Sequence, residues 1–253
     1  MRAFDAVLFD LGSTLIYFSE KWEAVTHQFH QELIRSLKDA GFLVDPEPFL
    51  HDFDTRQESY YNERDTEFIE YTTAYILKSL LADYGYTKVP DQVIQQALKA
   101  MYAVSQAYWK IEEETISTLE TLRNAGYRMA IVSNAGDDAD VQSLIDNTGI
   151  RPYFDVVVTS ASQGIRKPNP RIFRTALDKL GVMPEKAVMV GDTLGADILG
   201  AHNAGMPAIW ITRRADKTAN RAHEEIIHPD ATISGLDELP ELLERWLSIH
   251  EIY

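Results

Sequence analysis

The sequence predicts an α/β fold in which helices cover both faces of a doubly wound, mostly parallel sheet. From about residue 126 onward, short apolar runs rich in β-branched residues alternate with amphipathic helical patterns. The runs are apolar almost throughout, as expected of strands buried on both faces. Two such runs end in an acidic residue, at Asp10 and Asp192, which puts carboxylates at the sheet edge where open α/β folds bind ligands.

The strands and helices of this sheet can be placed in order along the chain. Strands are expected at residues 6–10, 128–134, 156–160, 187–192 and 208–212, with a weaker edge strand at 231–233. Three helical patterns between them stop at Gly126, Gly149 and Gly181, and glycine readily adopts the left-handed conformation that ends many helices. A last helix over 236–247 would close the domain, with right-handed crossovers between the strands.

Residues 17–113 interrupt this alternation. Stripes of apolar residues at helical spacing begin at Trp22, Phe68 and Val93, which predicts an inserted helical bundle. The polar stretch 51–67 is expected to be a loop or an irregular helix. Because the insert leaves the sheet just after Asp10 and returns before the second strand, its two connections should act as hinges above the crevice. The predicted domains are an α/β core, residues 1–16 and 114–253, and a helical cap, residues 17–113.

Composition excludes several classes of function. The 253 residues, 45% of them hydrophobic, suffice for one large domain or two unequal ones. The formal charge of −15 argues against nucleic-acid partners and against anionic membranes. A phosphate substrate would then need local positive charge from a metal ion, a lysine or helix N-termini. The chain has no cysteine, its first strand begins almost at once, and no apolar run reaches the roughly 18 residues of a membrane span, so we expect a cytoplasmic protein.

The strand ends carry groups suited to phosphoryl chemistry. Two carboxylates, Asp10 and Asp192, can share a Mg²⁺ ion, which prefers oxygen ligands. The hydroxyl of Ser133 and the ammonium of Lys167 can hold phosphoryl oxygens as charge develops on them. Asp10 is also a possible in-line nucleophile, because aspartate forms covalent phosphoryl intermediates.

Four strings of residues together resemble the four motifs of the haloacid dehalogenase superfamily. They are Asp10-Leu11-Gly12-Ser13-Thr14, Ser133-Asn134, Lys167-Pro168, and Gly191-Asp192 with Asp197 five residues later. Each motif alone would be a weak signal, but here all four occur in order on matching strand ends. The resemblance covers the whole chain and implies a Rossmann-like core, with the helical insert as the family's cap domain.

The resemblance also implies a role for each residue in handling the phosphoryl group. Asp10 would be the nucleophile, and Lys167 would steady both Asp10 and the transferring group. Ser133 and the backbone of Asn134 would bind the phosphoryl oxygens. Thr14 sits beside the nucleophile in this family, and it is either a further phosphate contact or a hydroxyl that steadies the turn. The implied enzyme is a phosphatase acting on a small phosphorylated metabolite.

The resemblance likewise implies a Mg²⁺ site. Asp10 and Asp192 would be ligands, together with the backbone carbonyl at position 12, which Gly12 retains. Asp197 would contribute indirectly, either by binding the metal through a water molecule or by orienting the ligands and Lys167. The implied metal site therefore needs no side chain at position 12.

Gly12 departs from the family's phosphatases, which carry an aspartate there as general acid and then general base. General acid catalysis contributes about 10² to 10⁴ in rate. The enzyme could use substrates with good leaving groups, such as acyl or aryl phosphates, or it could borrow an acid from water or from the cap. Cap candidates are Glu20, His27 and His30.

Two other functions stay open. In carbon–halogen cleavage Asp10 would attack carbon, and the halide would leave without a proton, so Gly12 would be tolerated. The family's dehalogenases, however, do not rely on Mg²⁺ and lack the Gly-Asp-x4-Asp string that residues 191–197 retain. A protein that binds a ligand or partner without turnover is the third possibility.

Overall fold

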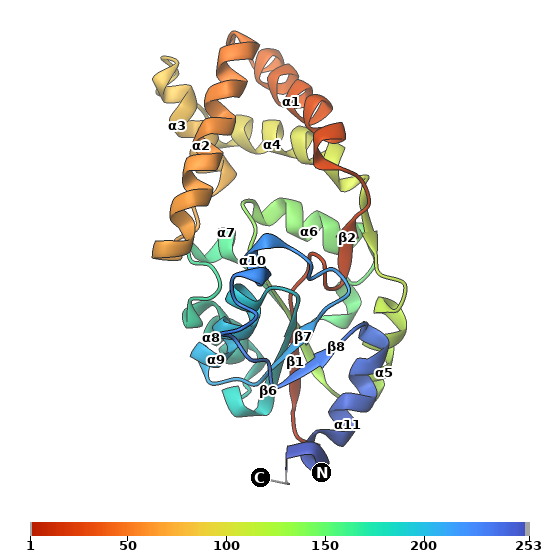
Figure 1. Ribbon diagram of the computed structural model, residues 1–253. Coiled ribbons are helices and arrows are strands. Elements are labelled where there is room, and N and C mark those ends of the chain that lie inside the picture. Colours follow the sequence, from red (N-terminus) through yellow and green to blue (C-terminus); the bar gives the residue numbers. More distant parts are fainter. Residues whose placement is uncertain (1, 251–253) are drawn as a thin grey trace.

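The computed structural model describes residues 2–250, and a six-stranded sheet lies at the centre of its lower half in Figure 1. The strands are β1 (Ala6–Phe9), β4 (Arg128–Ser133), β5 (Val156–Thr159), β6 (Ala187–Gly191), β7 (Ala208–Ile211) and β8 (Ala231–Ile233). Their order is β5-β4-β1-β6-β7-β8, and every neighbouring pair is parallel. The predicted α/β sheet is confirmed, and β1 lies in its interior, where the direction of strand addition reverses.

Helices cover both faces of this sheet. They are α5 (Thr115–Asn124), α6 (Asp138–Asn147), α7 (Ser160–Gln163), α8 (Pro170–Leu180), α9 (Leu199–Ala204), α10 (Thr218–Arg221) and α11 (Leu239–His250). Short turns of other helix types are η1 (Arg151–Tyr153), η2 (Pro184–Lys186), η3 (Leu194–Ile198) and η4 (Leu236–Glu238). In the described part of the chain, no helix is long and apolar enough to cross a membrane.

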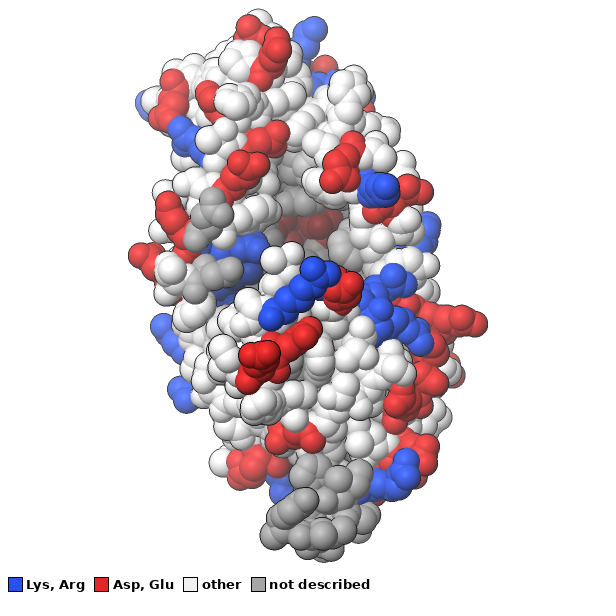
Figure 2. All heavy atoms as spheres, viewed as in Figure 1, with Lys and Arg blue, Asp and Glu red and all other residues white. Residues whose placement is uncertain are grey.

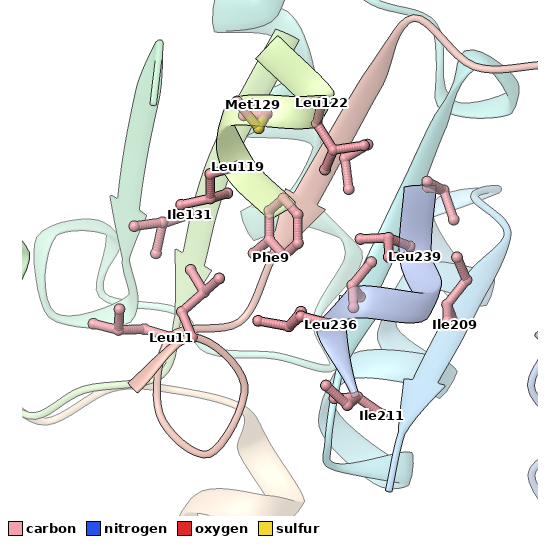
Figure 3. Close-up of a cluster of buried hydrophobic side chains, with 14 of the residues drawn as sticks. Phe9, Leu11, Leu119, Leu122, Met129, Ile131, Ile209, Ile211, Leu236 and Leu239 are labelled. Atoms are coloured by element: carbon pink, nitrogen blue, oxygen red, sulfur yellow. The ribbon is translucent and has the colours of Figure 1, made fainter. Parts of the chain in front are cut away.

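Strand β1 contributes to two separate hydrophobic clusters, because successive side chains of a strand point to opposite faces. Val7 and Phe9 join the cluster on the face covered by α5, α6 and α11, part of which Figure 3 shows. Ala6 and Leu8 join the cluster formed with α8 and α9. All four side chains are fully buried. The turn that follows β1 is therefore anchored from both faces of the sheet.

The insert forms a third cluster of its own. Its helices are α1 (Trp22–Asp39), α2 (Pro46–Glu67), α3 (Thr73–Asp83) and α4 (Asp91–Gln106), at the top of Figure 1. The expectation of a loop or irregular helix at 51–67 is wrong, because Phe49, Phe53 and Tyr60 bury one side of α2 while its polar majority faces solvent. The helix expected from Phe68 begins later, at Thr73, since Phe68 ends α2 in a left-handed conformation.

Two short strands connect the insert to the sheet. Strand β2 (Ile16–Phe18) enters the insert, β3 (Trp109–Ile111) leaves it, and the two pair antiparallel. Ion pairs fasten this hinge to the core, from Arg213 to Glu114 and from Arg214 to Glu112. The Arg214 guanidinium also lies 3.8 Å from the ring centroid of Tyr17. The two arginines therefore contact both connections of the insert, at Tyr17 on β2 and at the glutamates that follow β3.

Helix α9 packs unusually close to the loop that follows Lys167. A Cβ atom on Gly200 would lie 2.7 Å from Cε2 of Phe173 and 3.0 Å from Cα of Pro168. Alanine in place of glycine inside a helix normally stabilises it by about 1 kcal/mol. Here we expect Gly200→Ala to lower the free energy of unfolding in urea by about 1–3 kcal/mol, because overpacking outweighs helix propensity.

Asn203→Ala is the matched control, because Asn203 is exposed on the same helix and its replacement should be neutral or slightly stabilising. A Gly200→Ala protein as stable as the wild type would contradict the close packing of α9.

Candidate active site

The polar residues predicted at strand ends meet at one edge of the sheet. Asp10 directly follows β1, Ser133 is the last residue of β4, and Asp192 directly follows β6. Because β1 pairs with both β4 and β6, Asp10 lies between the other two. Asp10 is 9% exposed and Asp192 is 1% exposed. The sheet therefore presents three polar groups in one buried crevice.

Lys167 is the centre of this cluster. Its Nζ donates to Asp10 Oδ1 and Asp197 Oδ1, both at 2.6 Å, and to the carbonyl oxygen of Val132 at 2.7 Å. Burial alone lowers the pKa of a lysine, but the carboxylates of Asp10 and Asp197 outweigh it and raise the pKa of Lys167 above its usual value. Lys167 is thus a fixed positive charge against the candidate nucleophile.

The side chain of Asn134 fixes the backbone of Lys167. Its Oδ1 accepts from the Lys167 backbone N–H at 2.8 Å, and its Nδ2 donates to the Lys167 carbonyl at 3.0 Å. The sequence suggested only the backbone of Asn134 as a functional group, so this clamp is an additional role. Ser133 is buried at the end of β4. The hydroxyl of Thr14 is buried too, without a hydrogen-bond partner among the residues the structure describes.

Three carboxylates form a candidate metal centre. One oxygen each of Asp10, Asp192 and Asp197 lies within 4.8 Å of the others. Burial, followed by repulsion from Asp10 and Asp197, raises the pKa of Asp192 to about 7. Such a donor set, all oxygen and negatively charged, fits a hard divalent cation such as Mg²⁺. A cation there would also relieve the repulsion between the carboxylates.

Asp197 depends on the turn that holds it. The turn η3 is a single π-helical turn, and the Thr193 backbone N–H donates to Asp197 Oδ2 at 2.9 Å. A Cβ atom on Gly191 would lie 2.4 Å from Cγ of Asp197, so a larger residue at 191 would displace this carboxylate. The glycine before Asp192 therefore makes room for Asp197 to reach Lys167.

A second lysine, which the sequence analysis did not single out, also reaches the site. Lys217 forms an ion pair with Asp192 and donates to Thr193 Oγ1 at 3.0 Å. The fully buried Asn220 shapes the same loop, because its Nδ2 donates to the carbonyl oxygens of Asp192, at 2.7 Å, and Ala215, at 2.8 Å. The basic residues at 213–217 were a possible signal for this contact.

The hinge strand β3 covers the position of the missing acid. A Cβ atom on Gly12 would lie 3.4 Å from Cη2 and 3.6 Å from Cζ3 of Trp109. The indole ring thus borders the space into which a side chain at position 12 would extend. Sequence patterns could not predict this contact, since the two residues lie far apart in the chain.

Two of the three cap candidates for a borrowed acid have partners within the insert. His30 Nε2 lies 3.1 Å from a carboxylate oxygen of Asp54, and His27 Nε2 lies 2.8 Å from Nε2 of Gln31. Glu20 is exposed at the start of the insert. The cavity of about 270 Å³ at Lys167 is lined by other residues, among them Asn134, Arg166, Thr193 and His223. Figure 2 shows a hollow between the insert and the sheet, with acidic atoms visible inside it.

Known hydrolases resemble this chain in sequence. The family model of haloacid dehalogenase-like hydrolases matches residues 4–205. The glyceraldehyde 3-phosphate phosphatase of Methanopyrus kandleri is 34% identical over 240 residues, which covers 94% of this chain and 96% of that protein. The enzyme of the same name from Methanothermobacter thermautotrophicus is 43% identical over 130 residues, about half of each protein, 51% and 56%.

Solved structures show the same similarity over almost the whole chain. A HAD phosphatase from Thermococcus onnurineus has a TM-score of 0.60 and 28% identity, covering 95% of this chain and 98% of that chain. A 2-haloacid dehalogenase from Pseudomonas syringae pv. Tomato has a TM-score of 0.66 and 25% identity, covering 96% and 99%. The matched family region includes Asp10, Lys167, Asp192 and Asp197. The chain belongs to the haloacid dehalogenase-like hydrolase family, and it is a hydrolase.

Proposed function

We propose that this protein is a Mg²⁺-dependent phosphatase that hydrolyses a small phosphorylated metabolite through an aspartyl-phosphate on Asp10. The observation that carries the proposal is the ammonium of Lys167, which lies 2.6 Å from both Asp10 and Asp197. Retention of the whole acidic cluster supports a phosphatase, as do the names of the relatives that match nearly the full chain. The insert, residues 17–113, acts as a cap over the site.

In the proposed reaction, a carboxylate oxygen of Asp10 attacks phosphorus in line with the ester oxygen, and the phosphorus–ester bond breaks. Lys167, Ser133 and the backbone of Asn134 bind the phosphoryl oxygens as charge develops. Water then attacks phosphorus, which releases phosphate and regenerates the Asp10 carboxylate. Asp10, Asp192 and the Gly12 carbonyl would hold Mg²⁺, which would supply positive charge to the phosphoryl group.

The leaving oxygen must acquire a proton, and Gly12 has no side chain to give it one. A leaving group that is stable as an anion avoids this need, as in acyl and aryl phosphates. For an alkyl phosphate such as glyceraldehyde 3-phosphate, the substrate of the named relatives, the proton comes from water or from a group outside position 12.

A 2-haloacid dehalogenase is the second candidate, favoured by Gly12 and by the structural similarity to the Pseudomonas syringae dehalogenase. In that reaction Asp10 attacks carbon, and halide leaves without a proton. The cluster of Asp10, Asp192 and Asp197 favours the phosphatase instead, because these carboxylates could hold Mg²⁺ and the family's dehalogenases do not rely on that ion. Halide release from a 2-haloacid without added metal would reverse this preference, and binding of Mg²⁺ without turnover of either substrate class would indicate a non-catalytic protein.

We expect Asp10→Asn to reduce Mg²⁺-dependent phosphate release from p-nitrophenyl phosphate by about a thousandfold or more, because the nucleophile is lost. EDTA should abolish the activity of the wild type. Asp5→Asn is the control: Asp5 is exposed and directly precedes β1, so its replacement should leave the rate unchanged. Metal-dependent release that persists in a folded Asp10→Asn protein would show that the nucleophile is another residue.

A second prediction concerns the leaving group. We expect acetyl phosphate and p-nitrophenyl phosphate to react about 10² to 10⁴ times faster than simple alkyl phosphates, the rate that a general acid usually contributes. Gly12→Asp should narrow this gap, and more so together with Trp109→Ala, because the indole borders the space for the new carboxylate. Trp109→Ala alone serves as the control. An unchanged gap in a folded, Mg²⁺-binding double variant would contradict this interpretation of Gly12.

A further inference from the structure

A small cavity lies beside the candidate active site, where the insert meets the core. Its volume is about 130 Å³, and its lining includes Tyr60 and Glu70 from the insert and Arg166 and Asn134 from the core. Arg166 and Asn134 also line the larger cavity at Lys167, so the two cavities adjoin. A substrate whose phosphoryl group lies at Lys167 would extend toward this second space.

The polar residues of the cavity form a chain of hydrogen bonds. Nη1 of Arg166 donates to the hydroxyl of Tyr60 at 3.3 Å, and that hydroxyl donates to Oε1 of Glu70 at 2.6 Å. Burial and the hydrogen bond to Glu70 raise the pKa of Tyr60 to about 12. Tyr60 therefore keeps its proton at neutral pH, and it holds one oxygen of Glu70 in place.

Two polar atoms of the residues in this hydrogen-bonded series lack a partner. Nε of Arg166 and Oε2 of Glu70 are buried and have no hydrogen-bond partner within the described part of the chain. Each of the two residues is only 6% exposed. The ion pair between them is loose, with Nη1 3.8 Å from Oε2. Because buried polar groups are nearly always paired, Nε–H of Arg166 calls for an acceptor and Oε2 of Glu70 for a donor, and one hydroxyl group can supply both.

We propose that Arg166 and Glu70 form a subsite for a hydroxyl group of the substrate, so that the protein prefers phosphorylated polyols over simple alkyl phosphates. The hydroxyl donates to Oε2 of Glu70 and accepts from Nε–H of Arg166. A second phosphate or a carboxylate is disfavoured beside Oε2 of Glu70, because the two negative charges repel each other. The inference rests on the proposed phosphatase function and names its substrate class.

The subsite is complete only when the insert is docked on the core. The backbone N–H of Glu70 donates to the Gly164 carbonyl at 3.1 Å, and that of Arg166 donates to the Phe68 carbonyl at 3.0 Å. Ile69 and Ile165 form an antiparallel bridge between these two bonds. This short backbone pairing places Glu70 opposite Gly164 and therefore diagonally across from Arg166, which directly precedes Lys167.

The test compares glycerol 3-phosphate with propyl phosphate, which lacks the two hydroxyl groups. We expect the wild type to favour glycerol 3-phosphate in kcat/KM by about tenfold or more, because a site built to hydrogen-bond a hydroxyl rejects an analogue without one. Glu70→Gln should reduce this preference severalfold, since the amide is a weaker acceptor than a carboxylate. Glu67→Gln, which removes an exposed charge three residues away, should leave the preference unchanged.

Tyr60→Phe provides a second variant in case Glu70→Gln fails to fold, and it should also weaken the preference because Glu70 loses the donor that holds it. An equal preference in wild type, Glu70→Gln and Tyr60→Phe would overturn the subsite while leaving the phosphatase intact. Binding of both phosphates to the Asp10→Asn protein, measured by calorimetry with Mg²⁺, decides the inference without turnover. Tighter binding of glycerol 3-phosphate supports the subsite even if the protein is not a phosphatase, and equal or undetectable binding refutes it.

Discussion

The buried ammonium of Lys167, held between Asp10 and Asp197, is the interaction on which the site depends. Removal of one partner from such a pair typically costs about 3–5 kcal/mol, because it leaves an unbalanced buried charge. Yet Lys167 lies on a loop and not on a strand, so its position has to be fixed from elsewhere. The amide of Asn134 holds its backbone, and α9 approaches so closely that a Cβ atom on Gly200 would lie 3.0 Å from Cα of Pro168. The packing of the core therefore helps to fix the position of Lys167 in the site.

The same cluster explains how an acidic protein could attract a phosphate. Across the whole chain the formal charge is −15, which repels anions at long range. Inside the crevice, Lys167 and Lys217 face three carboxylates, and burial together with repulsion from Asp10 and Asp197 raises the pKa of Asp192. A divalent cation would reverse that sign locally, which makes attraction of the substrate conditional on the metal.

Strand periodicity in the sequence predicted which polar residues lie at the edge of the sheet. It could not predict the side-chain contacts that depend on tertiary packing. Parallel strands that end in Asp10, Ser133 and Asp192 had to bring these groups together, and they do. The clamp of Asn134 on Lys167 joins residues 33 positions apart, and an asparagine after a strand carries no mark of its side-chain partner. Helix α2 was missed because only a few aromatic side chains, such as Phe49 and Phe53, bury one side of a mostly polar segment.

The hinge strands couple the insert to the chemistry more directly than a flexible tether would. Gly12 bridges to Ile16 at the start of β2, and Trp109 on the partner strand β3 covers Gly12. The turn after the candidate nucleophile is therefore continuous with the element that carries the insert. On the far side of the crevice, the backbone pairing of residues 68–70 with 164–166 ties the insert to the loop of Lys167. Movement of the insert would therefore change the surroundings of the proposed leaving-group site and of the proposed hydroxyl subsite together, which would couple recognition of the substrate to exclusion of water from Asp10.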